Sequence, residues 1–291
     1  MASQEVIVAA VDGTPASDAG VVWAAREAES RHAVLRIVHV WHSPSYPTDP
    51  VLAIPERQDV FVNSAAVIAV ETAPFIDIEV LTQAGIPSIT LLQMTEGASL
   101  IVLGGHRRNR LDRIVFGSVT THLLARASCP VLVVRSERAA DASEVGPVVV
   151  GLDHDDTSDD ALDFAFAFAA SHGRDLVALQ AWTAHELSAS DQDVPTTIRG
   201  VQDALSAGMR LFHMKYPSVD VVTVAACESP VDALLDWSDK ASLLVVGSRG
   251  RGYFAGMLLG SVSSAVAHQA ACSVAVVRPR TMQQLLDALA S

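Results

Sequence analysis

The segment Gly247–Ser261, which reads GSRGRGYFAGMLLGS, is the most informative part of this sequence. Its glycines Gly247, Gly250 and Gly260 follow a Gly-x2-Gly-x9-Gly-Ser spacing. Glycine has no Cβ, so a loop built on it brings main-chain N–H groups close to a ligand. This spacing favours a loop that binds an anion through backbone donors.

The residues on either side of this loop indicate its structural setting. The apolar run Leu243–Val246 is typical of a strand, and the small-residue run Val262–Ala271 is typical of a helix. A helix that begins at Gly260-Ser261 directs its first N–H groups and its positive dipole end toward the loop. We therefore interpret the segment as a polyphosphate site. The plainer alternative is a flexible turn that binds nothing.

Composition limits the classes of partner. The 291 residues are enough for about two ordinary domains. The net charge of −13 argues against a general surface for nucleic acid or acidic membranes, so an anion site must be local. The first residues form no basic n-region and no apolar h-region, so we expect no targeting leader here, and no apolar run reaches the roughly 18 residues of a membrane span. Cys129, Cys227 and Cys272 form no CxxC motif, so we expect buried small hydrophobes in a soluble, cytoplasmic protein.

The first half of the chain alternates apolar runs with helical patterns. Ser17 or Asp18 is expected to cap the first helix. Pro87 favours a helix start, because proline suits the first helical position. The expected strands are 6–11, 34–41, 76–82, 100–103 and 131–134, and the expected helices are 17–31, 58–72, 87–95 and 118–127.

The second half repeats the first. Asp153 follows Asp12 by 141 residues, and Gly247 follows Gly104 by 143. We therefore expect a tandem duplication of one β-α-β-α unit. The expected domains are 1–136 and 147–280, joined by an acidic linker at 137–146 and followed by a tail at 281–291 with helical spacing.

Alternating strands and helices of this length predict an α/β fold, a parallel sheet with helices on both faces and right-handed crossovers. Ligands of such sheets bind outside the carboxyl ends of the strands, at the point where the strand order reverses. Asp12, Asp153 and both glycine loops fall at those ends. Because all of these residues fall at strand carboxyl ends, a binding site is favoured over a structural turn.

These residues resemble the universal stress protein family in its tandem, two-domain form. The resemblance covers nearly the whole chain, and its most specific part, Gly247-x2-Gly250-x9-Gly260-Ser261, is similar to the family's ATP-binding signature. It implies two doubly wound five-stranded parallel sheets of the adenine nucleotide α-hydrolase-like type. It also implies a pseudo-twofold pairing of the halves through 131–134 and 274–277, an intramolecular pseudo-dimer; a homodimer of whole chains stays open. The nucleotide-binding class of the family holds ATP, with Mg²⁺ expected here, and acts in stress and growth regulation.

The resemblance assigns nucleotide-binding roles to matched positions in the two halves. Asp153 is expected near the adenosine end or a metal, and Ser261 offers its amide and hydroxyl to the distal phosphates. A helix cap or turn is the structural alternative for Asp153, and a solvated loop charge is the alternative for Arg249. The expected sets are Asp153, Val246, Gly247, Arg249, Gly250, Gly260, Ser261 and Val262 in the second half, and Asp12, Val40, Gly104, Arg107, Gly117, Ser118 and Val119 in the first.

Both halves depart from the family's pattern. Arg107 stands in place of the second glycine in the first half, where it either blocks the backbone or supplies guanidinium donors to phosphate. In the second half Asp155, Asp156 and Glu228 add carboxylates, which weaken polyphosphate binding unless a metal bridges them. Because its glycine spacing is intact, we expect the second half to bind ATP more tightly than the first.

Three functions remain open. The leading one is an ATP-dependent regulatory protein, with no catalytic residues and at most slow ATP hydrolysis. No Walker A motif is present, because neither Lys215 nor Lys240 follows a glycine loop. The second function is that of a scaffold or dimerisation module of the same fold that binds no nucleotide. The third, an enzyme of a related adenine-nucleotide fold, is disfavoured because the sequence has no HIGH-like or SGGxDS-like segment.

Overall fold

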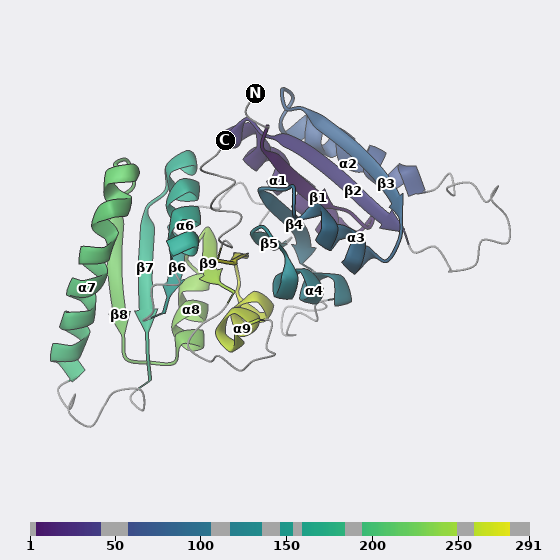
Figure 1. The fold of residues 1–291 in the computed structure, drawn as a ribbon. Helices are drawn as coiled ribbons and strands as arrows, with labels where there is room; N and C mark the ends of the chain where they lie inside the picture. Colours follow the sequence, from purple (N-terminus) through teal and green to yellow (C-terminus); the bar gives the residue numbers. More distant parts are fainter. Residues whose placement is uncertain are drawn as a thin grey trace. The chain divides into compact units, whose positions relative to one another are not determined.

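A computed structural model describes residues 4–41, 58–105, 117–135, 146–153, 159–183, 194–248 and 259–279 of the chain. The chain divides into two compact units, Met1–Ala142 and Ser143–Ser291, which we call domain 1 and domain 2 (Figure 1). The expected linker, apart from Gly146, and the expected tail lie outside the described residues. The expected pairing of the two halves through their last strands stays a prediction.

Domain 1 contains a parallel sheet with the strand order β3-β2-β1-β4-β5. This order places β1 between β2 and β4 and creates the switch point of a doubly wound fold. Its elements are β1 (Val6–Ala10), α1 (Pro15–Arg31), β2 (Val34–Trp41), α2 (Gln58–Thr72), β3 (Ile78–Ala84), α3 (Pro87–Met94), β4 (Leu100–Gly105), α4 (Ser118–Arg126) and β5 (Val131–Arg135).

Domain 2 has the same topology, with the parallel strand order β8-β7-β6-β9-β10. The prediction of an α/β fold built from two tandem doubly wound domains is therefore confirmed. Its elements are β6 (Val148–Leu152), α6 (Asp159–His172), β7 (Leu176–Ala181), α7 (Val194–Lys215), β8 (Val221–Ala226), α8 (Pro230–Ser238), β9 (Leu243–Gly247), α9 (Ser261–Gln269) and β10 (Ser273–Val277).

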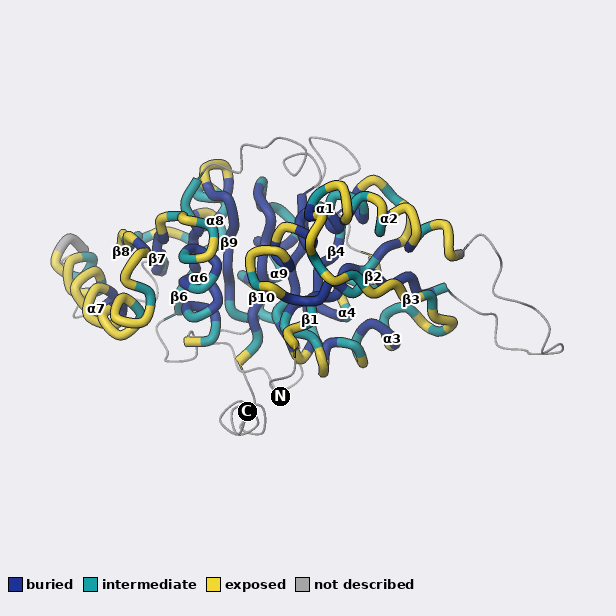
Figure 2. The backbone as a smooth tube through the Cα atoms, turned by 90° about the horizontal axis from the view of Figure 1, so that it is seen from above, coloured by how far each residue is buried: buried dark blue, intermediate teal, exposed yellow. Residues whose placement is uncertain are grey.

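The inner strands form the core of each domain, as the dark tube segments in Figure 2 show, whereas the outer strands β3 and β8 contain no buried residue. All five residues of β5 and all five of β10 are buried. Successive strand residues point to opposite faces of a sheet, so a continuous buried run requires cover on both faces. In domain 1, α1 packs with α2 and α3 packs with α4 to supply that cover.

The two domains also share a hydrogen bond from the turn after their last helix to a hydroxyl at the end of the preceding helix. The amide of Ser128, which follows α4, donates to Thr95 Oγ1 over 3.0 Å, and the amide of Ala271, which follows α9, donates to Ser238 Oγ over 3.0 Å. Both hydroxyls in turn donate to a carbonyl in the preceding helix turn, at 2.6 Å. Residues in these two pairs are 143 positions apart, which is the spacing of the glycine loops.

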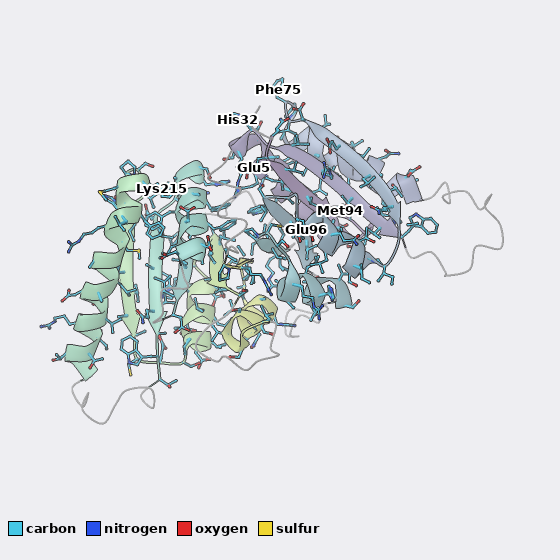
Figure 3. The ribbon with its side chains drawn as sticks, in the orientation of Figure 1. Glu5, His32, Phe75, Met94, Glu96 and Lys215 are labelled. Carbon is cyan, nitrogen blue, oxygen red and sulfur yellow. The ribbon has the colours of Figure 1, made fainter. Side chains whose placement is uncertain are left out.

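Strand β3 begins and ends two residues later than the predicted range 76–82. Its limits are set by β2: Leu35 N donates to Asp77 O over 2.9 Å, and Gly85 N donates to Trp41 O over 3.0 Å. The apolar character of Phe75 and Ile76 favoured an earlier start. Phe75 instead lies outside the sheet with 95% of its surface exposed (Figure 3).

The cysteines behave as expected for packing residues. Cys129 and Cys272 are buried, Cys227 is half-buried, and all three are free thiols. Burial raises the pKa of the Cys129 thiol to about 12. This thiol is therefore protonated at neutral pH and is a poor nucleophile.

Helix α7 is the longest helix described, with 22 residues. It is amphipathic: Leu205 and Met209 are buried, whereas Arg210 and Lys215 are exposed. In the part of the chain that the structure describes, no helix is both long enough and apolar enough to cross a membrane.

Candidate functional site

The expected residues of domain 1 come together at one end of its sheet. Strand β1 runs in register with both β2 and β4 as far as its last residue, Ala10. Asp12, Val40 and Gly104 lie one or two residues beyond that level, on three neighbouring strands. Parallel strands end at the same edge, so these positions share the carboxyl edge, where ligands of this fold bind.

The Asp12 carboxylate organises the turn between β1 and α1. Its Oδ1 accepts hydrogen bonds from Thr14 N (3.1 Å) and from Thr14 Oγ1 (2.6 Å). Between them Gly13 has φ of +77°, a value that glycine adopts without strain. Among the described residues nothing bonds Oδ2 of this exposed aspartate, so that oxygen can accept a donor from a ligand.

Helix α1 is capped by Thr14, and the prediction of Ser17 or Asp18 as its cap is wrong. Thr14 has extended φ and ψ of −94° and 152°, and its Oγ1 accepts a bond from Ser17 N at 3.3 Å. Pro15 occupies the first helical position, where its missing N–H is not needed. Thr14 was not predicted as the cap, although a threonine directly before a proline and three residues before Ser17 is a capping signal.

Negative charge is already unfavourable at this turn. Burial raises the pKa of Asp18, and the nearby Asp12 carboxylate raises it further. A phosphate beside these two carboxylates would add repulsion, whereas a hydroxyl or amino donor would relieve it. The electrostatics therefore fit the adenosine end of a nucleotide at Asp12 better than its phosphates.

Gly104 has a packing role that the sequence pattern did not reveal. A Cβ at this position would lie 2.2 Å from Ala16 O and 2.6 Å from Ser17 N, both main-chain atoms at the start of α1. Such a contact is closer than van der Waals radii allow, and neither backbone atom can rotate away. Packing against the start of α1 is therefore sufficient to explain a glycine at position 104.

Gly117 differs, because the fold among the described residues does not require a glycine there. It is the N-cap of α4, with φ of −64° and ψ of 163° that any residue adopts, and no side chain caps this helix. A Cβ at Gly117 would meet nothing within 4 Å among the described residues. The open space beside the first helical amides leaves room for a ligand.

Domain 2 places its expected residues in the same way. Gly151 of β6 pairs with Val246 of β9, so Asp153 and Gly247 lie just beyond that pair at the carboxyl edge. Gly260 is the N-cap of α9, with φ of −66° and ψ of 151°, and again no side chain caps the helix. The backbone geometry of the two helix starts is therefore nearly the same.

Domain 2 adds hydrogen bonds that hold the start of α9 against β9. Gly260 N donates to Ser248 O over 2.9 Å, and Ser248 N donates to the last residue of β10, Val277 O, over 2.7 Å. The Ser263 hydroxyl donates to Gly247 O over 2.5 Å. Ser263 was not among the predicted residues, although a second serine two residues after Ser261 indicates a further hydroxyl at the helix start.

These bonds decide which amides remain for a ligand. The N–H of Gly260 is used by Ser248, so it is not a donor to phosphate in this arrangement. The first N–H groups of a helix have no acceptor within the helix. The donors at the two helix starts are therefore the first-turn amides of Ser261, Val262 and Ser263 in domain 2, and those of Ser118, Val119 and Thr120 in domain 1.

Three expected residues, Arg107, Arg249 and Gly250, lie outside the described residues. Within the described ranges, no three or more His, Cys, Asp or Glu side chains gather as they would to hold a metal ion.

Comparison with known proteins identifies relatives of the whole chain. The model of the Universal stress protein family matches residues 5–135 and again residues 144–278. A universal stress protein of Mycolicibacterium smegmatis is 35% identical over 293 residues, which cover 96% of this chain and 99% of that relative. A universal stress protein of Mycobacterium tuberculosis is 33% identical over 289 residues, covering 94% of this chain and 97% of that relative.

Solved structures support the fold. The crystal structure of a universal stress protein from Archaeoglobus fulgidus matches with a TM-score of 0.66 at 19% identity, covering 95% of this chain and 99% of that one. A functionally unknown protein from Pseudomonas aeruginosa matches with a TM-score of 0.63 at 15% identity, covering 99% and 97%. The family model matches once in each domain, and relatives above 30% identity extend along nearly the full length of the chain. This chain therefore belongs to the universal stress protein family, in a tandem two-domain form.

Proposed function

We propose that this universal stress protein binds ATP together with Mg²⁺ at the carboxyl edges of its two sheets, and that the bound nucleotide regulates its activity in the stress response. One observation carries the proposal. In each domain a nine-residue helix begins at a glycine N-cap without a side-chain cap, after the strand (β4 or β9) that ends at the edge where Asp12 or Asp153 also lies. Uncapped first-turn amides and the helix dipole form a site for an anion.

The described residues divide into two parts that match the two ends of a nucleotide. The amides of Ser261 and Val262, with the Ser261 hydroxyl, hold the distal phosphates in domain 2. Asp153 accepts donors from the adenosine end, and the backbone of Val246 and Gly247 lies between these groups. Mg²⁺ neutralises phosphate charge and offsets the carboxylates nearby. Arg249 and Gly250 are proposed to line the ribose and phosphates.

Domain 1 uses the matched positions. Ser118 and Val119 offer their amides at the start of α4, Asp12 accepts through Oδ2, and the Val40 backbone lies beside the base. Arg107 is proposed to contribute guanidinium donors in place of a glycine backbone. The site is a binding site rather than a catalytic one, with at most slow hydrolysis of the bound ATP.

Domain 2 is proposed to bind ATP more tightly. It retains the complete Gly-x2-Gly-x9-Gly-Ser spacing, and the bonds from Gly260 and Ser263 hold the start of α9 in place. A site whose donors are already fixed loses less conformational entropy when the ligand binds.

Calorimetric titration with ATP and Mg²⁺ tests both the binding and the ranking. Gly260→Asp places a carboxylate at the phosphate end and is expected to weaken the tighter site about tenfold or more. Gly117→Asp is expected to affect only the weaker site. Gly97→Asp and Gly208→Asp are matched controls, because both glycines are exposed, lie away from the site and have nothing within 4 Å of a Cβ among the described residues.

The possible outcomes separate the functions. Equal loss of affinity from Gly260→Asp and Gly117→Asp would remove the ranking of the domains. Absence of any heat of binding in the unmodified protein would favour a scaffold that binds no nucleotide. Mass spectrometry of small molecules released from the purified protein provides an independent check, because a tightly bound nucleotide would be recovered with it.

A further inference from the structure

Strand β3 is an exposed outer edge of the sheet in domain 1. It pairs with β2 on one side, and no strand among the described residues lies beside it in domain 1 on the other (Figure 1). Five of its seven residues are exposed. Val80 and Leu81 at its centre are 48% and 38% exposed, which is unusual for apolar residues in the middle of a strand.

The backbone of β3 presents unused hydrogen-bonding groups at this edge. The bonds at the ends of the ladder, from Leu35 N to Asp77 O and from Gly85 N to Trp41 O, show that odd-numbered residues of β3 bond to β2. In a regular parallel ladder the alternate residues turn their N–H and C=O groups to the other side. The outward set is therefore Ile78, Val80, Thr82 and Ala84.

The corresponding edge of domain 2 is protected. The ladder bonds from Leu176 N to Asp220 O and from Trp182 N to Ala226 O show that even-numbered residues of β8 bond to β7. The outward carbonyl of Thr223 accepts a hydrogen bond from Gln202 Nε2 of α7 at 3.1 Å. No side chain among the described residues makes a comparable bond to β3.

Strand β3 also lacks the features that prevent edge pairing. Proteins usually protect an edge strand with lysine, proline, a bulge or a short length. The register of β3 with β2 is continuous from Ile78 to Ala84, without a bulge. Its one charged residue, Glu79, is paired with Arg36 of β2 at 2.8 Å, so little net charge remains along the edge.

We propose that β3 is a dimerisation edge, which pairs antiparallel with β3 of a second copy of this chain about a twofold axis at Leu81. This register places outward residues opposite one another, with Val80 facing Thr82 of the second copy, so each pair exchanges both main-chain hydrogen bonds. Glu79 faces Gln83, and no like charges meet. An edge that complements itself in this way fits an identical strand, the simplest closed assembly.

The apolar surroundings of β3 fit the same partner. Helix α2 packs on β3 and carries two exposed valines, Val67 and Val70, one helical turn apart. Two paired strands alone are marginally stable, so a stable dimer needs apolar area beside them. Val67 and Val70 are exposed on a helix that packs on β3, so we propose that they supply such area in the dimer.

Sedimentation equilibrium of the full chain tests the proposal. The unmodified protein is expected to have twice the mass of one chain. Leu81→Lys and Leu81→Glu place like charges opposite one another at the axis, so each variant alone is expected to be a monomer. Because position 81 faces itself, an equal mixture of the two variants is expected to recover the dimer through opposite charges.

Val222→Lys is the matched control, because it adds the same charge to the protected edge strand of domain 2, at an exposed valine. It is expected to remain a dimer, and circular dichroism and urea midpoints establish that all variants are folded. A monomeric unmodified protein, a Leu81→Lys variant that stays dimeric, or a mixture that stays monomeric would each overturn the proposal. Binding of ATP by calorimetry is independent of this result.

Discussion

The starts of helices α4 and α9 have nearly the same backbone but different attachments to their sheets. Both begin at a glycine with φ near −65° and no side-chain cap. In domain 2, Ser248 accepts the bond from the N-cap amide, and Ser263 bonds back to the strand. At the matched positions of domain 1, Gly105 and Thr120 make no such bonds among the described residues.

This difference shows what a duplication preserves. The fold sets the position of each helix start, because the strand order is the same in both domains. Side chains such as Ser263 determine how firmly that start is held. The two domains therefore keep nearly the same backbone at the helix start and differ in how that start is attached to the sheet.

The largest effect is expected from Gly104→Ala. Its new Cβ would collide with the Ala16 carbonyl, so domain 1 should lose about 1–3 kcal/mol of unfolding free energy. Gly117→Ala meets no neighbour among the described residues and should cost less than about 1 kcal/mol, as expected for an N-cap glycine. Urea denaturation measures both variants. If both variants lost the same unfolding free energy, the contact of Gly104 with α1 would not be what requires a glycine there.

A smaller effect is expected from Ser263→Ala. Loss of its bond to Gly247 should reduce the stability of domain 2 by about 1 kcal/mol and weaken ATP binding there toward that of domain 1. Thr120→Ala is the matched change in domain 1 and should alter neither quantity appreciably. Urea midpoints and calorimetric titration of both variants check this. An unchanged ATP affinity in Ser263→Ala would mean that the bond does not determine the ranking of the domains.

The smallest effect is expected from Asp18→Asn, which removes one of the two carboxylates at the domain 1 turn. The pKa of Asp18 is raised in the folded protein, so the folded state binds more protons than the unfolded chain near that pKa. Stability contributed by the neutral acid is therefore lost as pH rises through the folded pKa. The stability of the variant relative to the unmodified protein should therefore increase as pH rises from acid to neutral. Parallel urea titrations across that range measure the difference, and a constant difference would contradict the prediction.

Most of the fold followed from local patterns in the sequence. The strand β2 and the helix α2 have the predicted ends, because turn residues and apolar periodicity mark them clearly. Strand β3 was displaced by two residues, since its ends depend on pairing with β2 rather than on its own composition. Apolar residues such as Phe75 extend a predicted strand, but only a partner strand determines where pairing begins.

The site was predictable where it depends on spacing and less so where it depends on contacts. The repeat placed Asp12 and Gly117 at the carboxyl edge in domain 1, and their counterparts in domain 2. The spacing did not reveal that Gly104 packs against α1, because that contact joins segments far apart in sequence. It also did not reveal that the Gly260 amide is used by Ser248, since only the path of the chain brings the two together.

The hydrogen bond from Gln202 to Thr223 has a consequence for the size of any assembly. Of the two outer strands β3 and β8, only β3 is open among the described residues, so the proposed pairing through β3 joins two molecules and no more. If Gln202 were replaced by alanine, each chain would offer two such edges, and growth could continue from both into a filament. One glutamine amide would then separate a protein that assembles as a finite pair from one that polymerises.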